Sequence, residues 1–297
     1  GDGEVYIAGG VESMSRAPYA FSKNTGGGNL IAYDTALGWR FVNPRMEALY
    51  GTDPMGVTAE NIAEMTGITR LEQDEFALAS HQRAVAAQDS GKFAEEILPI
   101  SIPQRKGDPV VISQDERPRR DTSLEALSRL KPAFKPNGTV TAGNSSGLND
   151  GAAALLVMSA EKACILGLKP MARFISSGVS GIEPRIMGLG PIEATRRALA
   201  HAVLQIGDIS LAEINEAFAV QTLAVMRELG LSHTITNVNG GAVALGHPLG
   251  CSGARILTTL LYEMRRRAPQ EKRPFYGLAA LCVGVGQGEA TIVEWLE

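Results

Sequence analysis

The sequence predicts an α/β fold in which helices cover a layered sheet core. In the C-terminal part, short apolar runs alternate with helical patterns. A continuous apolar run at 152–158 has the composition of a central strand. Hydrophobic residues make up 44% of the chain and charged residues 20%, which is enough to bury a sizeable core. The length of 297 residues suits one large domain or two ordinary ones.

The first elements are a strand and two helices. The strand is expected at 4–8, and the stretch that follows is rich in glycine and proline, which indicates loops. Within that stretch, a helix is predicted over 70–90, because Thr69 is a suitable N-cap and Glu72 stands at the third helical position. A second helical pattern covers 57–65.

The chain then returns to the core at the 152–158 strand, and a second half begins near Met171. Ser252 is expected to cap the helix that follows His247. The elements of the second half are expected in this order: a strand at 172–176, a helix at 192–203, a strand at 211–215, a helix after Phe218, a helix after His247, and two closing strands around Cys282.

Charge and cysteine usage exclude several classes of protein. A formal net charge of −4 gives no reason to expect nucleic acid or an anionic membrane surface as a partner. No apolar run approaches the length of a membrane span. Three irregularly spaced cysteines form neither a disulfide framework nor a metal site. A reducing, cytoplasmic location is therefore expected.

Three segments combine reactive side chains with turns. The glycine-rich loop at 239–255 presents His247, which Pro248 biases away from helical geometry. Asn215 stands at a strand-to-helix junction, and Cys282 precedes a glycine-rich turn. Taken singly, a structural histidine, a helix cap and an inert buried thiol are the ordinary interpretations. Together the segments supply a base, an amide and a thiol.

These segments resemble the thiolase family in residue identity and in order. The matching motifs are Asn-Glu-Ala-Phe at 215–218, Asn-x-Asn-Gly-Gly-x-x-x-x-Gly-His-Pro-x-Gly-x-Ser-Gly-Ala-Arg at 237–255 and Cys-x-Gly-x-Gly-x-Gly at 282–288. The long middle motif is the most specific of the three. Residues 8–15 and the pantetheine-contacting segment at 138–153 also match, so the resemblance covers essentially the whole chain.

The resemblance implies a thiolase fold with two similar βαβαβαββ halves and a loop domain inserted into the first. On this chain, 1–21 and 149–169 would belong to the first half, 22–148 to the loop domain and 170–297 to the second half. Thiolases carry their nucleophilic cysteine shortly before the segment that matches 8–15. The first half is therefore expected to be truncated, with the nucleophile in a longer protein whose targeting signals, if any, lie upstream.

The resemblance also implies roles in acyl transfer. His247 would deprotonate the nucleophile and face the thioester oxygen, and Asn215 would hold a water at the enolate oxygen. Cys282 would exchange protons with the acetyl α-carbon and with the coenzyme A sulfur, a role that suits a thiol whose neighbours bring its pKa nearer to neutral. The Gly284 N–H would complete a second oxyanion hole.

Coenzyme A is implied as a substrate, with no covalently bound cofactor and no metal. Ser146 and Ala142 match positions toward the pantetheine, and Met55 matches a methionine that lines the acyl pocket. Arg119 matches a residue toward the nucleotide, although a solvated charge in a basic run is an equal alternative. The family further implies a homodimer or a homotetramer.

Two signals disagree on the acyl group. Gly-Trp-Arg-Phe-Val-Asn-Pro at 38–44 resembles 3-oxoadipyl-CoA thiolases, in which Arg40 would pair with a substrate carboxylate. Pro54 replaces a histidine of many short-chain, acetoacetyl-CoA enzymes, and 54–56 is closer to medium- and long-chain 3-ketoacyl-CoA thiolases. We favour 3-oxoadipyl-CoA. The alternative to an enzyme is a non-catalytic acyl-CoA-binding protein. The presence of Asn215, His247 and Cys282 argues against this alternative.

Overall fold

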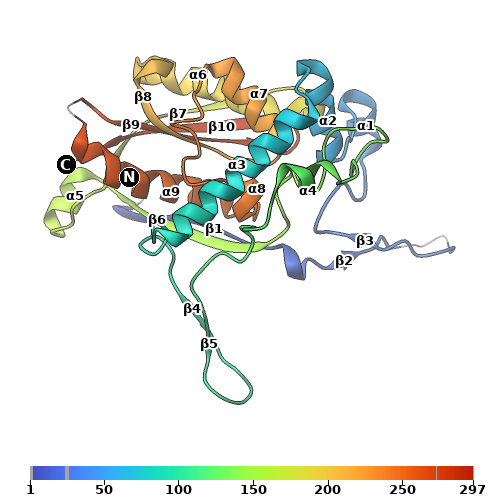
Figure 1. The fold of residues 1–297 in the computed structure, drawn as a ribbon, viewed down its shortest axis with the longest axis horizontal. Helices are drawn as coiled ribbons and strands as arrows, with labels where there is room; N and C mark the ends of the chain where they lie inside the picture. Colours follow the sequence, from blue (N-terminus) through green and yellow to red (C-terminus); the bar gives the residue numbers. More distant parts are fainter. Residues whose placement is uncertain (1–2, 24–26, 272, 297) are drawn as a thin grey trace.

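The computed structural model describes residues 3–23, 27–271 and 273–296, and a four-stranded sheet forms its C-terminal part (Figure 1). The strand order is β7 (Ala172–Gly181), β10 (Gln287–Trp295), β9 (Tyr276–Val283) and β8 (Ile209–Ile214). β8 runs parallel to β9, and the other pairs are antiparallel. This parallel pair sends the ends of β8 and β9, with Asn215 and Cys282, to the same edge of the sheet.

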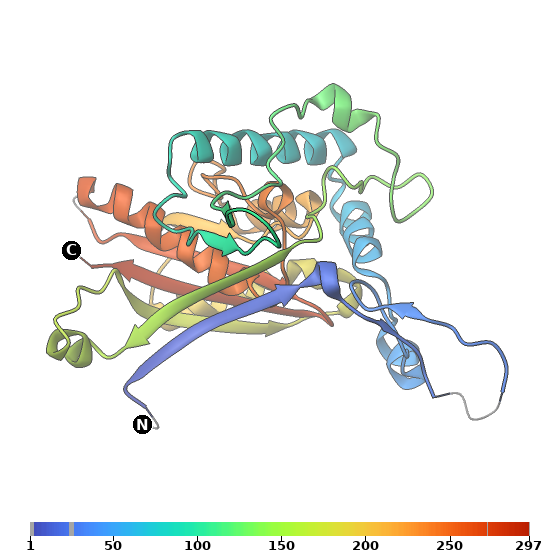
Figure 2. The same cartoon turned by 90° about the horizontal axis from the view of Figure 1, so that it is seen from below.

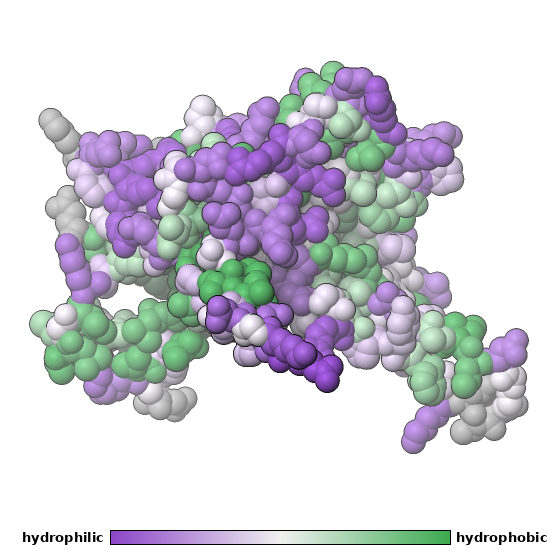
Figure 3. All heavy atoms as spheres, turned by 60° about the horizontal axis from the view of Figure 1, so that its bottom comes forward, coloured by the Kyte–Doolittle hydropathy of each residue, from purple (hydrophilic) through white to green (hydrophobic). Residues whose placement is uncertain are grey.

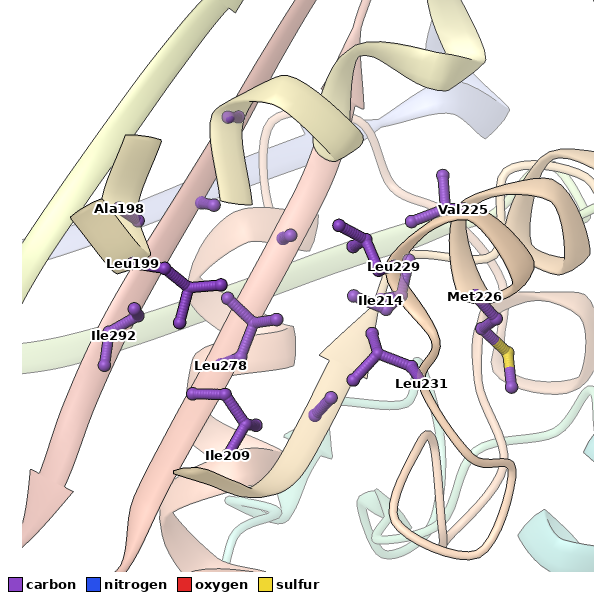
Figure 4. Close-up of a cluster of buried hydrophobic side chains, with 14 of the residues drawn as sticks. Ala198, Leu199, Ile209, Ile214, Val225, Met226, Leu229, Leu231, Leu278 and Ile292 are labelled. Atoms are coloured by element: carbon purple, nitrogen blue, oxygen red, sulfur yellow. The ribbon is translucent and has the colours of Figure 1, made fainter. Parts of the chain in front are cut away.

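Helices cover both faces of this sheet. On one face, α6 (Gly190–Ala202) and α7 (Ala219–Leu229) bury a cluster of aliphatic side chains against β8, β9 and β10 (Figure 4). On the other face, α9 (Ser252–Arg267) packs Ile256, Leu260 and Met264, which recur at helical spacing. From Leu211 onward, successive side chains of β8 point to opposite faces, so Leu211 joins the α9 cluster while Ala212 and Ile214 join the other.

A second, two-stranded sheet lies across α9. β1 (Val5–Ser13) pairs antiparallel with β6 (Asp150–Met158) along their full lengths, and α9 contacts both of these strands as well as β8 and β9. The helix therefore lies between two sheets. Ile7 is 79% exposed and Val11 72% exposed on β1, and Figure 3 shows hydrophobic surface gathered at the lower left, where β1, β6 and α5 lie.

The chain leaves this two-stranded sheet after Ser13 and returns at Asp150 (Figure 2). The long helix of the excursion is α3 (Arg70–Asp89), preceded by α2 (Met55–Thr66). The remaining elements are β2 (Tyr19–Ala20), β3 (Tyr33–Asp34), α1 (Pro44–Tyr50), β4 (Ile100–Ile102), β5 (Val110–Ile112), α4 (Leu124–Ser128), α5 (Ala160–Ile165), α8 (Ala242–Leu245) and the 3-10 turns η1 (Met14–Arg16), η2 (Pro184–Leu189), η3 (Ile206–Asp208) and η4 (Ala268–Gln270).

Most expected elements are present, and the predicted capping of α3 is confirmed. The Thr69 side chain accepts from the Glu72 backbone, while the Glu72 carboxylate accepts from the Thr69 backbone at 2.7 Å. The first strand is longer than predicted, because Gly9 and Gly10 continue it. A Cβ on Gly10 would lie 1.7 Å from the Gly250 carbonyl oxygen, so this close approach of the His247 loop to β1 requires glycine.

Two further expectations are wrong in detail. Ser252 does not cap α9, which begins at Ser252 itself after Cys251 and has no side-chain cap. The short helices and hairpins of the excursion, together with α5 around Cys164, are not among the predicted elements. Within the described residues, no helix is long and apolar enough to cross a membrane.

Candidate active site

Asn215 and His247 lie next to each other at the carboxyl edge of the four-stranded sheet. The backbone N–H of Asn215 donates to the Ala280 carbonyl at 2.9 Å, which continues the β8–β9 pairing by one residue. Its side-chain Nδ2 lies 3.3 Å from His247 Nε2. Asn215 Oδ1 is buried and has no hydrogen-bond partner among the described residues. An unpaired buried amide oxygen beside an imidazole is suited to a water or a substrate group.

Asn215 is not a helix cap, since α7 begins four residues later at Ala219, with Phe218 in the cap position. The backbone between Asn215 and Phe218 instead pairs with another chain segment. Ser145 and Phe218 form an antiparallel bridge, and Ser146 N–H donates to the Ala217 carbonyl at 3.0 Å. These contacts attach the predicted pantetheine segment to the predicted catalytic turn.

The imidazole of His247 is oriented by Ser252. The Ser252 hydroxyl donates to the Pro248 carbonyl at 3.0 Å, so its only proton is used there. His247 Nδ1 lies 2.6 Å from Ser252 Oγ, and with the hydroxyl proton on the Pro248 carbonyl we assign Nδ1 as the donor of that hydrogen bond. In the tautomer with the proton on Nδ1, the Nε2 lone pair faces the Asn215 Nδ2 amide group at 3.3 Å. This tautomer is the one that a general base at Nε2 requires.

The environment keeps His247 neutral. Burial of the ring, followed by the charge of Arg255, lowers the pKa of His247 from 6.5 to about 4. The ring is therefore unprotonated at neutral pH. The backbone supports this position, because His247 N–H donates to the Gly147 carbonyl at 3.3 Å.

Cys282 lies at the end of β9 and packs against Met187 and Ala217, with Met55 and Phe218 beside them. It therefore adjoins the Asn215 turn through Ala217. Burial raises the pKa of Cys282 to about 12. Its neighbours therefore do not bring this pKa nearer to neutral, because apolar side chains surround the thiol. In this environment the group is a protonated acid.

The turn after Cys282 leaves open space at Gly284. A Cβ built on Gly284 meets nothing within 4 Å, so packing within the described residues does not require glycine there. Val285, the next residue, has a φ of +67°, a left-handed conformation that β-branched residues rarely adopt. Strain of this kind is found where the surrounding structure holds a turn in one geometry.

The cluster of arginines at 117–120 lines a hollow of about 490 Å³ together with Glu116, Pro118 and Asp121. Arg120 is paired with Asp89 through two hydrogen bonds. The Arg119 side chain is exposed, and its backbone N–H donates to His81. Arg117 lies against Gly147, where a Cβ would come within 1.8 Å of its guanidinium. This basic hollow thus borders the segment that carries Ser146, whereas Ala142 in the same segment is exposed.

The segment that carries Arg40 is connected through Asp53 to the segment that carries Met55. The Trp39 indole N–H donates to the Asp53 carbonyl at 3.2 Å, and Met55, two residues later, contacts the Cys282 cluster. Arg40 follows Trp39 and is exposed. Its Nη1 donates to the Gly38 carbonyl at 3.0 Å, and in the described part of the chain no carboxylate forms a salt bridge with it.

Two residues of the site were not among the predicted catalytic or binding residues. Ser252 orients the imidazole, and Glu216 accepts three hydrogen bonds next to Asn215. The sequence carries a signal for Glu216, because a glutamate in a run of apolar residues is expected to be buried with partners. Ser252 carries no such signal, since serine at a helix start is commonplace.

Comparison with known proteins matches two family models to this chain. The model described as "Thiolase, N-terminal domain" matches residues 1–161, and "Thiolase, C-terminal domain" matches residues 168–295. Beta-ketoadipyl-CoA thiolase of Acinetobacter baylyi is 52% identical over 298 residues, which cover 99% of this chain and 73% of that protein.

Two further proteins widen the comparison. Acetyl-CoA acetyltransferase of Chromobacterium violaceum is 51% identical over 99% of this chain and 73% of its own length. Among solved structures, Bacillus anthracis acetyl-CoA acetyltransferase has a TM-score of 0.90 and 46% identity, covering 99% of this chain and 72% of that one. Relatives of nearly equal identity, at 52% and 51%, thus carry different enzyme names.

Proposed function

This chain belongs to the thiolase family, and we propose that it serves acyl transfer between 3-oxoadipyl-CoA and coenzyme A through cleavage or formation of a carbon–carbon bond. The observation that carries the proposal is the His247 ring. Its Nδ1 is bound by Ser252, its pKa is lowered to about 4, and its Nε2 faces the Asn215 amide. A neutral imidazole with a free Nε2 is the base that activates a thiol nucleophile.

In the thiolysis direction, His247 takes the proton of the nucleophilic thiol, and the thiolate adds to the 3-oxo carbon. The bond between C2 and C3 breaks, and the electron pair forms an enolate stabilised by His247 and a water on Asn215. Cys282 donates its proton to C2 of this enolate, and acetyl-CoA is released. The Cys282 thiolate then accepts the proton of the incoming coenzyme A, whose sulfur displaces the acyl group, and His247 returns its proton to the nucleophile. Gly284 N–H would stabilise the second oxyanion.

We assign the nucleophile to none of the three cysteines of this sequence. Cys282 has the acid–base role, and burial raises the pKa of Cys251, which makes it a poor thiolate. Cys164 lies in α5, between the end of β6 and β7. None of residues 1–297 is therefore assigned as the acceptor of the acyl group.

Substrate preference is proposed from Arg40 and from the relatives. A carboxylate at the end of an acyl chain needs a cationic partner when it leaves water. Arg40 is free of salt bridges within the described residues, and Trp39 links its segment to Asp53, two residues before Met55. The name of the Acinetobacter relative supports the same substrate. Pro54 supports a general medium- or long-chain 3-ketoacyl-CoA thiolase as the second candidate, whereas the acetyltransferase name of another relative fits an acetoacetyl-CoA thiolase.

The remaining assignments are parts of the same proposal. Ser146 and Ala142 would contact pantetheine, and Arg119 would contact the nucleotide of coenzyme A. Residues 22–148 would form the loop domain between 1–21 and 149–169, with 170–297 as the second half. We propose a homodimer or homotetramer in the cytoplasm, on the basis of the family and of the bacterial origin of the relatives.

Acylation followed by mass spectrometry tests the roles in the full-length gene product. After mixing with acetyl-CoA, His247→Ala should remain unmodified because the nucleophile has lost its base. Cys282→Ala should gain one acetyl group, yet form no carbon–carbon bond. Cys251→Ala is the matched control and should behave like the wild type.

Two outcomes would reject this assignment. Equal acetylation of His247→Ala and Cys282→Ala would show that the two residues do not act at different steps. Binding of acyl-CoA by the wild type without any acetylation would favour a non-catalytic acyl-CoA-binding protein.

A further inference from the structure

Glu216 is a buried carboxylate that follows Asn215 directly in the chain. It is 1% exposed and accepts three hydrogen bonds from three different segments. Ser80 Oγ of α3 donates at 2.7 Å, and Val243 N–H at the start of α8 donates at 3.0 Å, both to Oε2. Asn237 Nδ2 donates to Oε1 at 2.8 Å. A carboxylate is the side chain that can accept all of them.

The partners of Glu216 are themselves fixed. Asn237 has a φ of +48°, and its amide both accepts from Ile214 N–H and donates to the Ile214 carbonyl, each at 2.8 Å. Reversing that amide would set oxygen against oxygen. Ser80 Oγ, besides donating to Glu216, accepts from Gly241 N–H at 3.1 Å. Each hydrogen bond of this cluster thus has one definite direction.

Close packing adds to these hydrogen bonds. A Cβ on Gly241 would lie 2.3 Å from the Glu216 carboxyl carbon, so the carboxylate rests directly on the backbone that begins α8. α3 also holds the preceding loop, because Arg83 donates to the carbonyls of Thr236 and His233 at 2.9 and 3.0 Å. The loop before α8 has little freedom to move while these contacts persist.

The hydrogen bonds of Glu216 connect the segment that carries Asn215 with the segment that carries His247. Asn215 is held on one side of Glu216 by the chain itself, and α8 on the other side leads through Gly246 directly into His247. We infer that Glu216 is a positioning residue, which sets the distance between the Asn215 amide and the His247 ring by anchoring both of their segments to one carboxylate. This inference rests on the proposed function, because it concerns the reaction of that same site.

Glu216→Gln is the sharpest substitution, because it keeps shape and volume. An amide has one oxygen and one NH₂ group, so the NH₂ must face either Asn237 or the Ser80 and Val243 donors. Ser80→Ala removes a single donor and should act in the same direction with a smaller effect. The matched control is Glu263→Gln, since Glu263 is also a buried carboxylate that accepts three hydrogen bonds, from Asn239, Arg266 and Arg267.

The experiment measures the variants in the full-length gene product at a temperature where all remain folded. In Glu216→Gln, kcat should fall about 10- to 100-fold while KM for coenzyme A and for the 3-ketoacyl-CoA changes less than about twofold, as expected for misplaced reacting groups. Amide exchange at Val243 should accelerate about 10-fold or more, because its acceptor is weakened. Glu263→Gln should lower the melting temperature without either change.

Three results would overturn the inference: a kcat of Glu216→Gln that stays at the wild-type value, an equal loss of kcat in Glu263→Gln, or unchanged exchange at Val243. A wild type without thiolase activity would instead reject the proposed function. The exchange measurement would still decide whether Glu216 holds the segment that leads to His247.

Discussion

Ser252 Oγ lies 2.6 Å from Nδ1 of His247, a contact that favours the tautomer with the proton on Nδ1. The contact spans the start of α9, so the helix that packs between the two sheets also orients the imidazole. A buried, well-packed helix is a rigid support for a side chain that must keep one tautomer and one orientation.

Ser252→Ala should lower the rate of acylation about 10- to 100-fold, within the range that general base catalysis contributes. Without its acceptor, Nδ1–H is left unpaired, and the tautomer with the proton on Nε2 becomes populated. Stopped-flow acylation of the full-length gene product measures the change. Cys251→Ala, at the adjacent buried position, is the control and should retain the wild-type rate; a wild-type rate in Ser252→Ala would refute the orienting role.

The pH dependence of the site should follow His247. Its pKa in the folded protein is about 4, below the ordinary value of 6.5. The base is thus available at neutral pH and is lost as the pH falls through about 4. By linkage, the contribution of the neutral ring to stability is complete above pH 6.5 and declines as the pH falls toward 4.

Titration of the His247 ring by NMR measures this pKa directly, and the spectrum of His247→Ala identifies the signal. A midpoint near 6.5 would mean that the ring is solvated, and would contradict the buried position described here.

Substrate discrimination should depend on Arg40. A charge-assisted contact is worth about 1.5 to 3 kcal/mol, which corresponds to about ten- to a hundredfold in specificity. Arg40→Met should therefore reduce kcat/KM for 3-oxoadipyl-CoA by that factor, while an uncharged 3-ketoacyl-CoA of similar length is almost unaffected. Arg45→Met, another exposed arginine of the same region, is the matched control.

Equal losses on both substrates, or a change in the size of the assembly, would reject the role of Arg40 in recognising a carboxylate. The second candidate, a general 3-ketoacyl-CoA thiolase, would then be preferred.

Stability should increase when Val203 is replaced by glycine. Val203 ends α6 in the left-handed region, with a φ of 56°, and its side chain is 91% exposed. A residue with a Cβ costs about 1 to 2 kcal/mol in that conformation, and glycine is the usual residue there. Val203→Gly should raise the free energy of unfolding by about 1 kcal/mol in urea denaturation. Val203→Ala, which keeps the Cβ, should gain less; an equal gain would point to another cause.

The elements predicted from the sequence are those with strong local signals. α3 carries its capping box in sequence, and α9 carries Ile256, Leu260 and Met264 at helical spacing. The β2–β3 and β4–β5 hairpins have no such pattern, since their short strands are largely exposed and have no buried face to impose alternation.

The residues of the site also divide into those with a local sequence signal and those without one. His247, Asn215 and Cys282 are recognisable from their motifs, whereas the contacts of Ser252 and Glu216 depend on segments that only the fold brings together. Ser80, for example, lies 136 positions from Glu216. The raised pKa of Cys282 is a product of packing and leaves no trace in the local sequence.

The pairing at the two ends of the segment between β1 and β6 affects how far this segment can vary among homologous proteins. Ser13 and Asp150 are register partners, and the Asp150 carboxylate accepts from the Ser15 backbone and hydroxyl at 2.9 and 2.6 Å. The two ends of the segment between them thus lie side by side, while α2, α3 and Ser146 also hold this segment against the rest of the molecule. Insertions or deletions in its exposed hairpins, β2–β3 and β4–β5, would leave the pairing of β1 with β6 and the contacts of α3 in place, so these loops can diverge while the carbon–carbon bond chemistry is inherited unchanged.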